Sequence, residues 1–302
     1  RWGGFAAAAA AGRLRGLAPD RLAQALLIAE NHGPGLLSSQ AHGFGGAHVK
    51  EGIAWSVVNG LAALDLAEAG FTGFPHTLDI KKLYDGGRIV EDLGGSFFID
   101  RTYFKPYSCC RAIHAAVDAI SALMEDEGLS ADDIKGVRVD ACALANDLSN
   151  HIDPPNFEAA QFSVPFGLAV AAIDGALALQ PLSPETLGRA DLIDFAKRVK
   201  LNLDPELEAL FPLRIAERVT LHTERGTFVK LAENALGDTD NPMGRSGLQA
   251  KFRNLTESLL APTRQEIIIE AASSLEDGGL RKLVAALKEP LNQIRDEYEA
   301  AE

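Results

Sequence analysis

The reactive side chains of this sequence are concentrated in one short segment, YFKPYSCCRAIHAAVDAI, which spans residues 103–120. A lysine, two adjacent cysteines, an arginine and a histidine lie between Lys105 and His114. Charged and reactive groups are costly to bury without partners, so their density at the start of a helical stretch indicates a functional site. These residue types are suited to binding an anion and to moving a proton.

Lys105 precedes Pro106, and a residue before proline is disfavoured in helical geometry. We therefore expect Lys105 to lie on an extended approach to a helix that begins near Arg111. A cation beside the positive end of a helix dipole is unfavourable unless an anion lies between them. Lys105 and Arg111 are accordingly candidate residues for binding a substrate carboxylate. The alternative for Lys105 is an ordinary solvated lysine.

His114 lies one helical turn after Cys110 and shares its face of the predicted helix. Both are candidate catalytic residues that handle a proton, and a packed core histidine explains His114 equally well. A cysteine close to a helix N-terminus and an arginine should have a lowered pKa, so Cys109 and Cys110 are also candidates for a redox-sensitive thiol. Small buried cysteines are the commoner alternative. No second cysteine pair follows at the spacing of a zinc site, and we predict no metal.

A second candidate site lies at Lys50, which follows a glycine-rich stretch at residues 31–47 and precedes an apolar helical pattern. A lysine in a partly closed pocket can have a lowered pKa and act as a base. Pairing with Glu51 is the alternative. The glycine-rich stretch matches neither a phosphate-binding loop nor a dinucleotide fingerprint. Gln161 and Ser163, at the entrance of an apolar helix, are candidate substrate-binding residues, with helix capping as the alternative.

An arrangement of helices with one mixed region must position these residues. Apolar residues at helical spacing predict helices over residues 5–17, 20–30, 53–70, 111–127, 159–179, 247–260, 264–272 and 279–287. Alternating patterns predict strands over residues 137–141, 218–222 and 227–231, the last two as a hairpin. The order predicts a mainly α fold with an α+β part. We expect residues 1–100 and 241–302 to form an all-helical domain, interrupted by a smaller α+β lid domain at residues 101–240.

Length and composition limit the classes of function. A chain of 302 residues has room for two domains. A net charge of −13 disfavours nucleic acid as a partner, because phosphate binding needs clustered Lys and Arg, although a few local cations can bind a small anion. The three cysteines form no disulfide framework, and no apolar run reaches the ~20 residues of a membrane span. We therefore predict a cytoplasmic protein that does not bind membranes.

Five separated blocks resemble one known family in their sequence and their order. They are FAAAAAAGRLRGL (5–17), HVKEGIAWSVVNGLAALDLAEAGFTG (48–73), YFKPYSCCRAIHAAVDA (103–119), AAQFSVPFGLAVAAIDG (159–175) and NPMGRSGLQAKF (241–252). Together they resemble the MmgE/PrpD family of dehydratases, decarboxylases and epimerases, which act on small di- and tricarboxylates. The ordered set is more specific than any single block.

The resemblance implies an all-helical domain interrupted by an α+β lid, with the active site between them, in a homodimer. It implies chemistry without a cofactor on a polycarboxylate such as 2-methylcitrate, cis-aconitate or iminodisuccinate. Lys50 would match the active-site lysine of the helical domain, and Lys105 the lysine at the lid boundary. Cys110 stands near where the decarboxylase branch has a histidine, and Phe166 near where that branch has a tyrosine. Family members also carry an N-terminal third before this sequence starts, and we expect part of the site to lie there.

We therefore predict a cofactor-independent lyase or isomerase, a dehydratase or an epimerase, that removes a proton α to a carboxylate. Fixed cations would stabilise the charge that develops on the carboxylate. The predicted site residues are Lys50, His114 and Cys110 for catalysis, and Lys105, Arg111, Gln161 and Ser163 for substrate binding. The alternative is a catalytically incomplete family member that acts as a binding or scaffold subunit. A weaker alternative is a redox sensor that uses the adjacent cysteines.

Overall fold

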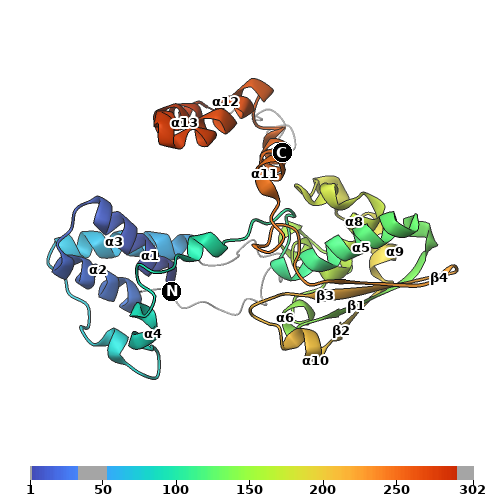
Figure 1. Cartoon of the computed structure of the whole chain (residues 1–302), viewed down its shortest axis with the longest axis horizontal. Helices are drawn as coiled ribbons and strands as arrows, with labels where there is room; N and C mark the ends of the chain where they lie inside the picture. Colours follow the sequence, from blue (N-terminus) through green and yellow to red (C-terminus); the bar gives the residue numbers. More distant parts are fainter. Residues whose placement is uncertain (1, 33–52, 291–302) are drawn as a thin grey trace. The chain divides into compact units, whose positions relative to one another are not determined.

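The computed structural model describes residues 2–32 and 53–290. The chain divides into two compact units, Arg1–Arg101 and Thr102–Glu302. Helices dominate both, and the second unit also holds a four-stranded sheet (Figure 1). The predicted mainly α fold with an α+β part is therefore confirmed.

Three helices form the body of the first unit: α1 (Trp2–Leu14), α2 (Pro19–Asn31) and α3 (Ile53–Glu68). Each packs against the other two. Small residues let their backbones approach closely, since a Cβ atom at Gly60 of α3 would lie 2.5 Å from the carbonyl oxygen of Gly4 in α1. Their shared core consists of Ala8, Ala25, Ile28, Ala29, Ala63, Leu64 and Ala67. The short helices that follow are η3 (Thr77–Asp79), α4 (Gly86–Val90) and η4 (Phe98–Arg101).

The sheet of the second unit has the strand order β2-β1-β3-β4. Its strands are β1 (Ile134–Ala141), β2 (Val199–Leu203), β3 (Glu217–Thr223) and β4 (Gly226–Ala232). β1 runs parallel to β2 and antiparallel to β3, and β3 and β4 form the predicted hairpin. β2 was not predicted, although its five residues VKLNL alternate between apolar and polar types; in the structure only the first of them is buried.

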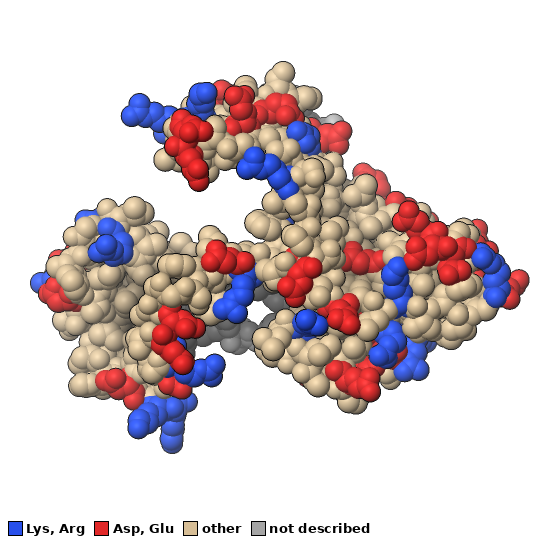
Figure 2. Space-filling model, viewed as in Figure 1, with Lys and Arg blue, Asp and Glu red and all other residues tan. Residues whose placement is uncertain are grey.

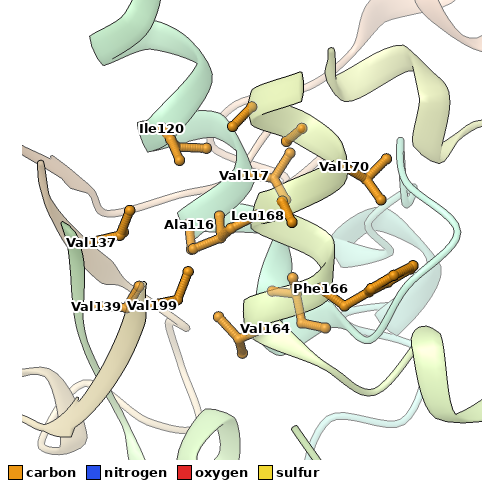
Figure 3. Packing of buried hydrophobic residues seen from close by; sticks show 14 of the residues in the cluster. Ala116, Val117, Ile120, Val137, Val139, Val164, Phe166, Leu168, Val170 and Val199 are labelled. Atoms are coloured by element: carbon orange, nitrogen blue, oxygen red, sulfur yellow. The ribbon is translucent and has the colours of Figure 1, made fainter. Parts of the chain in front are cut away.

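Three helices lie on one side of the sheet: α5 (His114–Glu127), α8 (Val164–Ile173) and α9 (Ala190–Ala196) (Figure 1). Their apolar side chains meet those of the strands in one core, as Figure 3 shows for Val117, Ile120, Val137 and Val199. α8 is buried from Val164 to Ala172, as expected for a helix that is apolar all round. α8 is therefore part of the same hydrophobic core that α5 packs against.

The helix predicted over residues 159–179 is three separate pieces, so that prediction is wrong in extent. They are α7 (Phe157–Ala160), α8 and η7 (Ala176–Leu179). Ser163 caps the start of α8, Pro165 lies in its first turn, and Gly175 follows its end with a φ of +86°. A left-handed glycine ends a helix because the chain leaves helical geometry there at no steric cost.

The second unit ends in three helices, α11 (Gly244–Thr256), α12 (Pro262–Ser273) and α13 (Leu280–Lys288). They share a small core of their own around Leu260, Ile268 and Ala286. All three were predicted, and their grouping with residues 1–100 stays a prediction. The remaining short elements are η5 (Arg111–Ile113), η6 (Ala131–Asp133), α6 (Ala143–Asn146), η8 (Pro184–Thr186), α10 (Pro205–Glu208) and η9 (Leu275–Gly279).

Charge is distributed over the surface of the molecule. Figure 2 shows groups of Asp and Glu side chains over the sheet-bearing unit, with Lys and Arg between them. Within residues 2–32 and 53–290, every helix is too short or too polar to cross a membrane. The predicted cytoplasmic location stays a prediction.

Candidate functional site

The segment between Lys105 and α5 forms a compact turn around one carbonyl group. Lys105 Nζ donates a hydrogen bond of 3.1 Å to the carbonyl oxygen of Cys109. His114 Nε2 lies 3.3 Å from the same oxygen. The predicted lysine and histidine are therefore brought together at one acceptor, although they lie on different elements of the chain.

Two further backbone hydrogen bonds fix this turn against neighbouring elements. The Cys110 N–H donates to the carbonyl oxygen of Gln161 at 2.7 Å, and the Ser108 N–H donates to that of Leu179 at 2.8 Å. Gln161 directly follows α7, and Leu179 ends η7. The turn is therefore held by the segments on either side of α8.

Arg111 lies almost entirely inside the protein, with 8% of its surface exposed. Its Nη2 pairs with the carboxylate of Asp238, and its guanidinium lies 5.3 Å from the centre of the Tyr103 ring. Its Nη1 is buried and has no hydrogen-bond partner within the described residues. An unused donor on a buried cation is suited to receiving an acceptor atom of a ligand.

His114 is fully buried at the first position of α5, and its ring centre lies 5.2 Å from that of Tyr107. Burial lowers the pKa of His114 to about 3, and the neighbouring Arg111 and Lys105 add to this decrease. Because a carbonyl oxygen only accepts, the contact with Cys109 assigns the hydrogen to Nε2. These features describe a neutral, packed histidine. Its proposed role in proton transfer stays a prediction.

The expected low pKa of the cysteines is wrong for Cys109. This side chain is only 4% exposed. Burial raises the pKa of its thiol, and the neighbouring Cys110 adds to the effect. Desolvation outweighs the helix N-terminus and the nearby lysine. Cys109 is therefore an inert core residue, which removes one of the two thiols from the redox-sensor alternative. Cys110 is half-buried and lies at the N-cap of η5.

The two polar residues before α8 have different surroundings. The Ser163 hydroxyl donates to the carbonyl oxygen of His151 at 2.6 Å and accepts from the Phe166 N–H at 3.2 Å. It thus acts as a helix cap, which was the alternative given for it, and its role in substrate binding stays a prediction. Gln161 is half-buried next to Cys110, and its side-chain role also stays a prediction.

Three buried or half-buried acids near the turn were not predicted. The Asp118 carboxylate accepts from the Tyr107 hydroxyl and from the Leu236 N–H, both at 2.6 Å. Glu217 accepts from the Ala116 N–H at 2.7 Å, and the third acid is Asp238, the partner of Arg111. Asp118 was visible in the sequence as the first acid of an apolar helix. Glu217 and Asp238 gave no such signal, because strand pairing and a turn bring them to α5.

Two further predictions concern Lys50 and metal binding. Lys50 lies outside the described residues. In the described ranges, no group of three or more His, Cys, Asp or Glu side chains is placed to hold a metal ion.

Two family models match the chain. The MmgE/PrpD N-terminal domain matches residues 1–84, and the MmgE/PrpD C-terminal domain matches residues 107–277. The second match includes most of the turn that follows Lys105, the whole sheet and α11.

The chain is also similar to curated proteins. A cis-aconitate decarboxylase of Aspergillus terreus is 27% identical over 301 residues, which cover 91% of this chain and 61% of that protein. A cis-aconitate decarboxylase of Mus musculus is 23% identical, over 91% of this chain and 58% of that protein. The chain thus spans about 61% of the length of the Aspergillus relative.

Proposed function

Because the chain belongs to the MmgE/PrpD family, we propose that it is a cofactor-independent lyase or isomerase that removes a proton α to a carboxylate. Its substrate is a small di- or tricarboxylate such as 2-methylcitrate, and its reaction a dehydration or an epimerisation. One observation carries the proposal: Lys105 and the buried Arg111 lie at one turn, and Arg111 Nη1 has no partner among the described residues.

These cations suit the chemistry of the reaction. When a base takes the α-hydrogen as a proton, the electron pair of the C–H bond moves onto the carboxylate oxygens. Fixed positive groups stabilise that charge more than they stabilise the ground state. In dehydration the electron pair then expels hydroxide from the neighbouring carbon, and an acid protonates it to water. In epimerisation a proton returns to the opposite face of the same carbon.

The family likeness points to Lys50 for handling the proton, whereas Cys110 and His114 were chosen for their spacing on one predicted helical face. Lys50 is the proposed base, and Cys110 and His114 are the proposed partners in proton transfer. Decarboxylation is less favoured for this chain than for its relatives. By the resemblance, Cys110 stands near where the decarboxylase branch has a histidine, and Phe166 stands near where it has a tyrosine. Phe166 is buried in the core and has no hydroxyl.

A binding or scaffold subunit is the second candidate function. Burial lowers the pKa of His114 to about 3 and raises that of Cys109, so neither exchanges protons readily near neutral pH. This observation favours a chain that binds an anionic ligand and catalyses no reaction.

Proton exchange in D₂O separates the two functions. The protein is incubated with citrate-like and succinate-like acids, and the loss of α-proton signals is followed by NMR. We expect one class of acid to exchange, and Lys105→Met to slow this exchange by about 10²-fold. Lys197→Met, at an exposed lysine paired with Asp194, is the matched control and should leave the rate unchanged. Exchange that survives Lys105→Met with little change would contradict the role of Lys105. If the folded protein exchanges no α-proton of any acid tested, the binding or scaffold subunit is favoured.

A further inference from the structure

The connection from β4 into α11 is attached to the same turn that holds Lys105. The Phe104 N–H donates to the carbonyl oxygen of Gly237 at 2.9 Å. Asp238, the next residue, pairs with Arg111. Gly237 has a φ of +92°, which favours glycine, and a Cβ atom there would collide with the Phe104 carbonyl. The connection is therefore fixed to the turn at Gly237 and Asp238, six residues before α11 begins.

One face of α11 is directed toward this turn. Asn254 Nδ2 donates to Gln180 Oε1 at 3.3 Å. Gln180 follows Leu179, whose carbonyl oxygen accepts from the Ser108 N–H at 2.8 Å. Lys251 lies three residues before Asn254 and so shares its face of the helix. This geometry places Lys251 on the side of α11 that faces the segment from Lys105 to Cys109.

The two lysines at this position differ from Arg111, which is paired with Asp238. Burial lowers the pKa of Lys251, and the charge of Lys105 adds to this decrease. The positive charges of Lys105, Lys251 and Arg111 lower the pKa of His114 further, in addition to the effect of burial. Within the part of the chain that the structure describes, neither lysine lies within ion-pair distance of a carboxylate, whereas Arg111 is paired. Like charges that face each other without a counterion are unfavourable, and a bound anion between them removes that cost.

We propose that Lys251 is a carboxylate-binding residue, and that with Lys105 it forms a two-lysine site for a ligand with at least two carboxylates. The proposal rests on the proposed function for the class of ligand, and deepens it by adding a residue from the C-terminal helices. Arg111 Nη1 supplies a further donor beside the site.

The site is tested by isothermal titration of the full chain with citrate, tricarballylate and succinate, and with acetate as the monocarboxylate. We expect at least one of the polycarboxylates to bind more tightly than acetate. Lys251→Ala should weaken its affinity about tenfold or more, the usual effect of losing one charge-assisted hydrogen bond. Lys251→Arg should bind nearly as well as the unmodified protein, because it keeps the charge. Lys282→Ala, at an exposed lysine of α13, is the matched control and should change nothing.

Either of two results would overturn the inference. One is that Lys251→Ala binds the polycarboxylate as tightly as the unmodified protein. The other is that none of the three polycarboxylates binds. Binding that depends on Lys251 without proton exchange would reject the proposed enzyme activity and support the two-lysine site. Proton exchange that does not depend on Lys251 would support the proposed enzyme activity and reject the two-lysine site.

Discussion

At the scale of single residues, the pKa of one buried carboxyl group, that of Glu217, is raised by burial and lowered by some of its neighbours. Glu217 is fully buried at the start of β3 and accepts a hydrogen bond from Ala116 in the first turn of α5. Burial raises the pKa of Glu217 to about 8, although the bond from Ala116 and the charge of Arg111 act to lower it. Its Oε1 has no partner among the residues described. Glu217 therefore changes its charge close to neutral pH.

This pKa predicts a dependence of stability on pH. A carboxyl whose folded-state pKa is raised stabilises the fold fully below its ordinary pKa, and this contribution is lost as the pH rises through about 8. The lowered pKa of His114 has the opposite effect, since it makes stability rise with pH, but only below its ordinary pKa of 6.5. Between pH 6.5 and 8, Glu217 is therefore the acting group of the two. We expect the unmodified protein to lose about 1–2 kcal/mol of stability over this range relative to Glu217→Gln.

Thermal unfolding at a series of pH values measures this difference. The amide oxygen introduced by Glu217→Gln can still accept the hydrogen bond from Ala116, so the variant should fold. Glu224→Gln, at an exposed acid of the hairpin, is the control and should follow the unmodified protein. Parallel curves for the unmodified protein and Glu217→Gln would show that Glu217 keeps an ordinary pKa.

At the scale of elements, α5 organises both the candidate site and the exit toward the C-terminal helices. Its first turn carries His114, and the turn before it carries Arg111. One helical turn further, Asp118 joins Tyr107 to the Leu236 N–H. The connection between β4 and α11 is thus held by Arg111 and Asp118, two charged residues of one helical segment.

Removing the carboxylate of Asp118 should loosen this connection. Asp118→Ala leaves the hydroxyl of the buried Tyr107 and a backbone N–H without their acceptor, which costs about 1–3 kcal/mol. We expect a lowered melting temperature and faster hydrogen exchange at the Leu236 amide. Asp126→Ala is the control on the same helix, because its carboxylate is 60% exposed and pairs only with Lys230 among the described residues. That change should cost less than about 1 kcal/mol. Equal losses for both variants would contradict the connecting role of Asp118.

At the scale of the whole molecule, the family likeness implies a homodimer, which we retain as a proposal. Several large apolar side chains of α3 are exposed, among them Trp55 at 69% and Val58 at 54%. An exposed apolar group of this kind favours association. Light scattering should therefore give a mass of about twice the 32.2 kDa of one chain. A mass of one chain across the micromolar range would contradict the dimer.

The sequence by itself determined the class of fold and most of the helices, and it indicated the region of the candidate site. Helical spacing of apolar residues was enough for α2, α3 and α5, because each buries one face over several turns. The density of charge between Lys105 and His114 identified the turn. The sequence patterns also predicted the β3–β4 hairpin, since both strands alternate around a short turn.

Only the tertiary structure decided which charges act together. Glu217 lies 101 residues beyond its partner Ala116, and Asp238 lies 127 residues beyond its partner Arg111. No local pattern shows that these acids would meet the segment from Arg111 to α5. The pKa values of His114 and Cys109 likewise depend on burial, which the spacing of residues near a helix start does not reveal. Helix and hairpin signals arise from neighbours in the chain, whereas desolvation and long-range charge arise from contacts that form when distant elements pack. Part of the composition of the candidate site could therefore be read from one segment of the sequence, but its electrostatics could not.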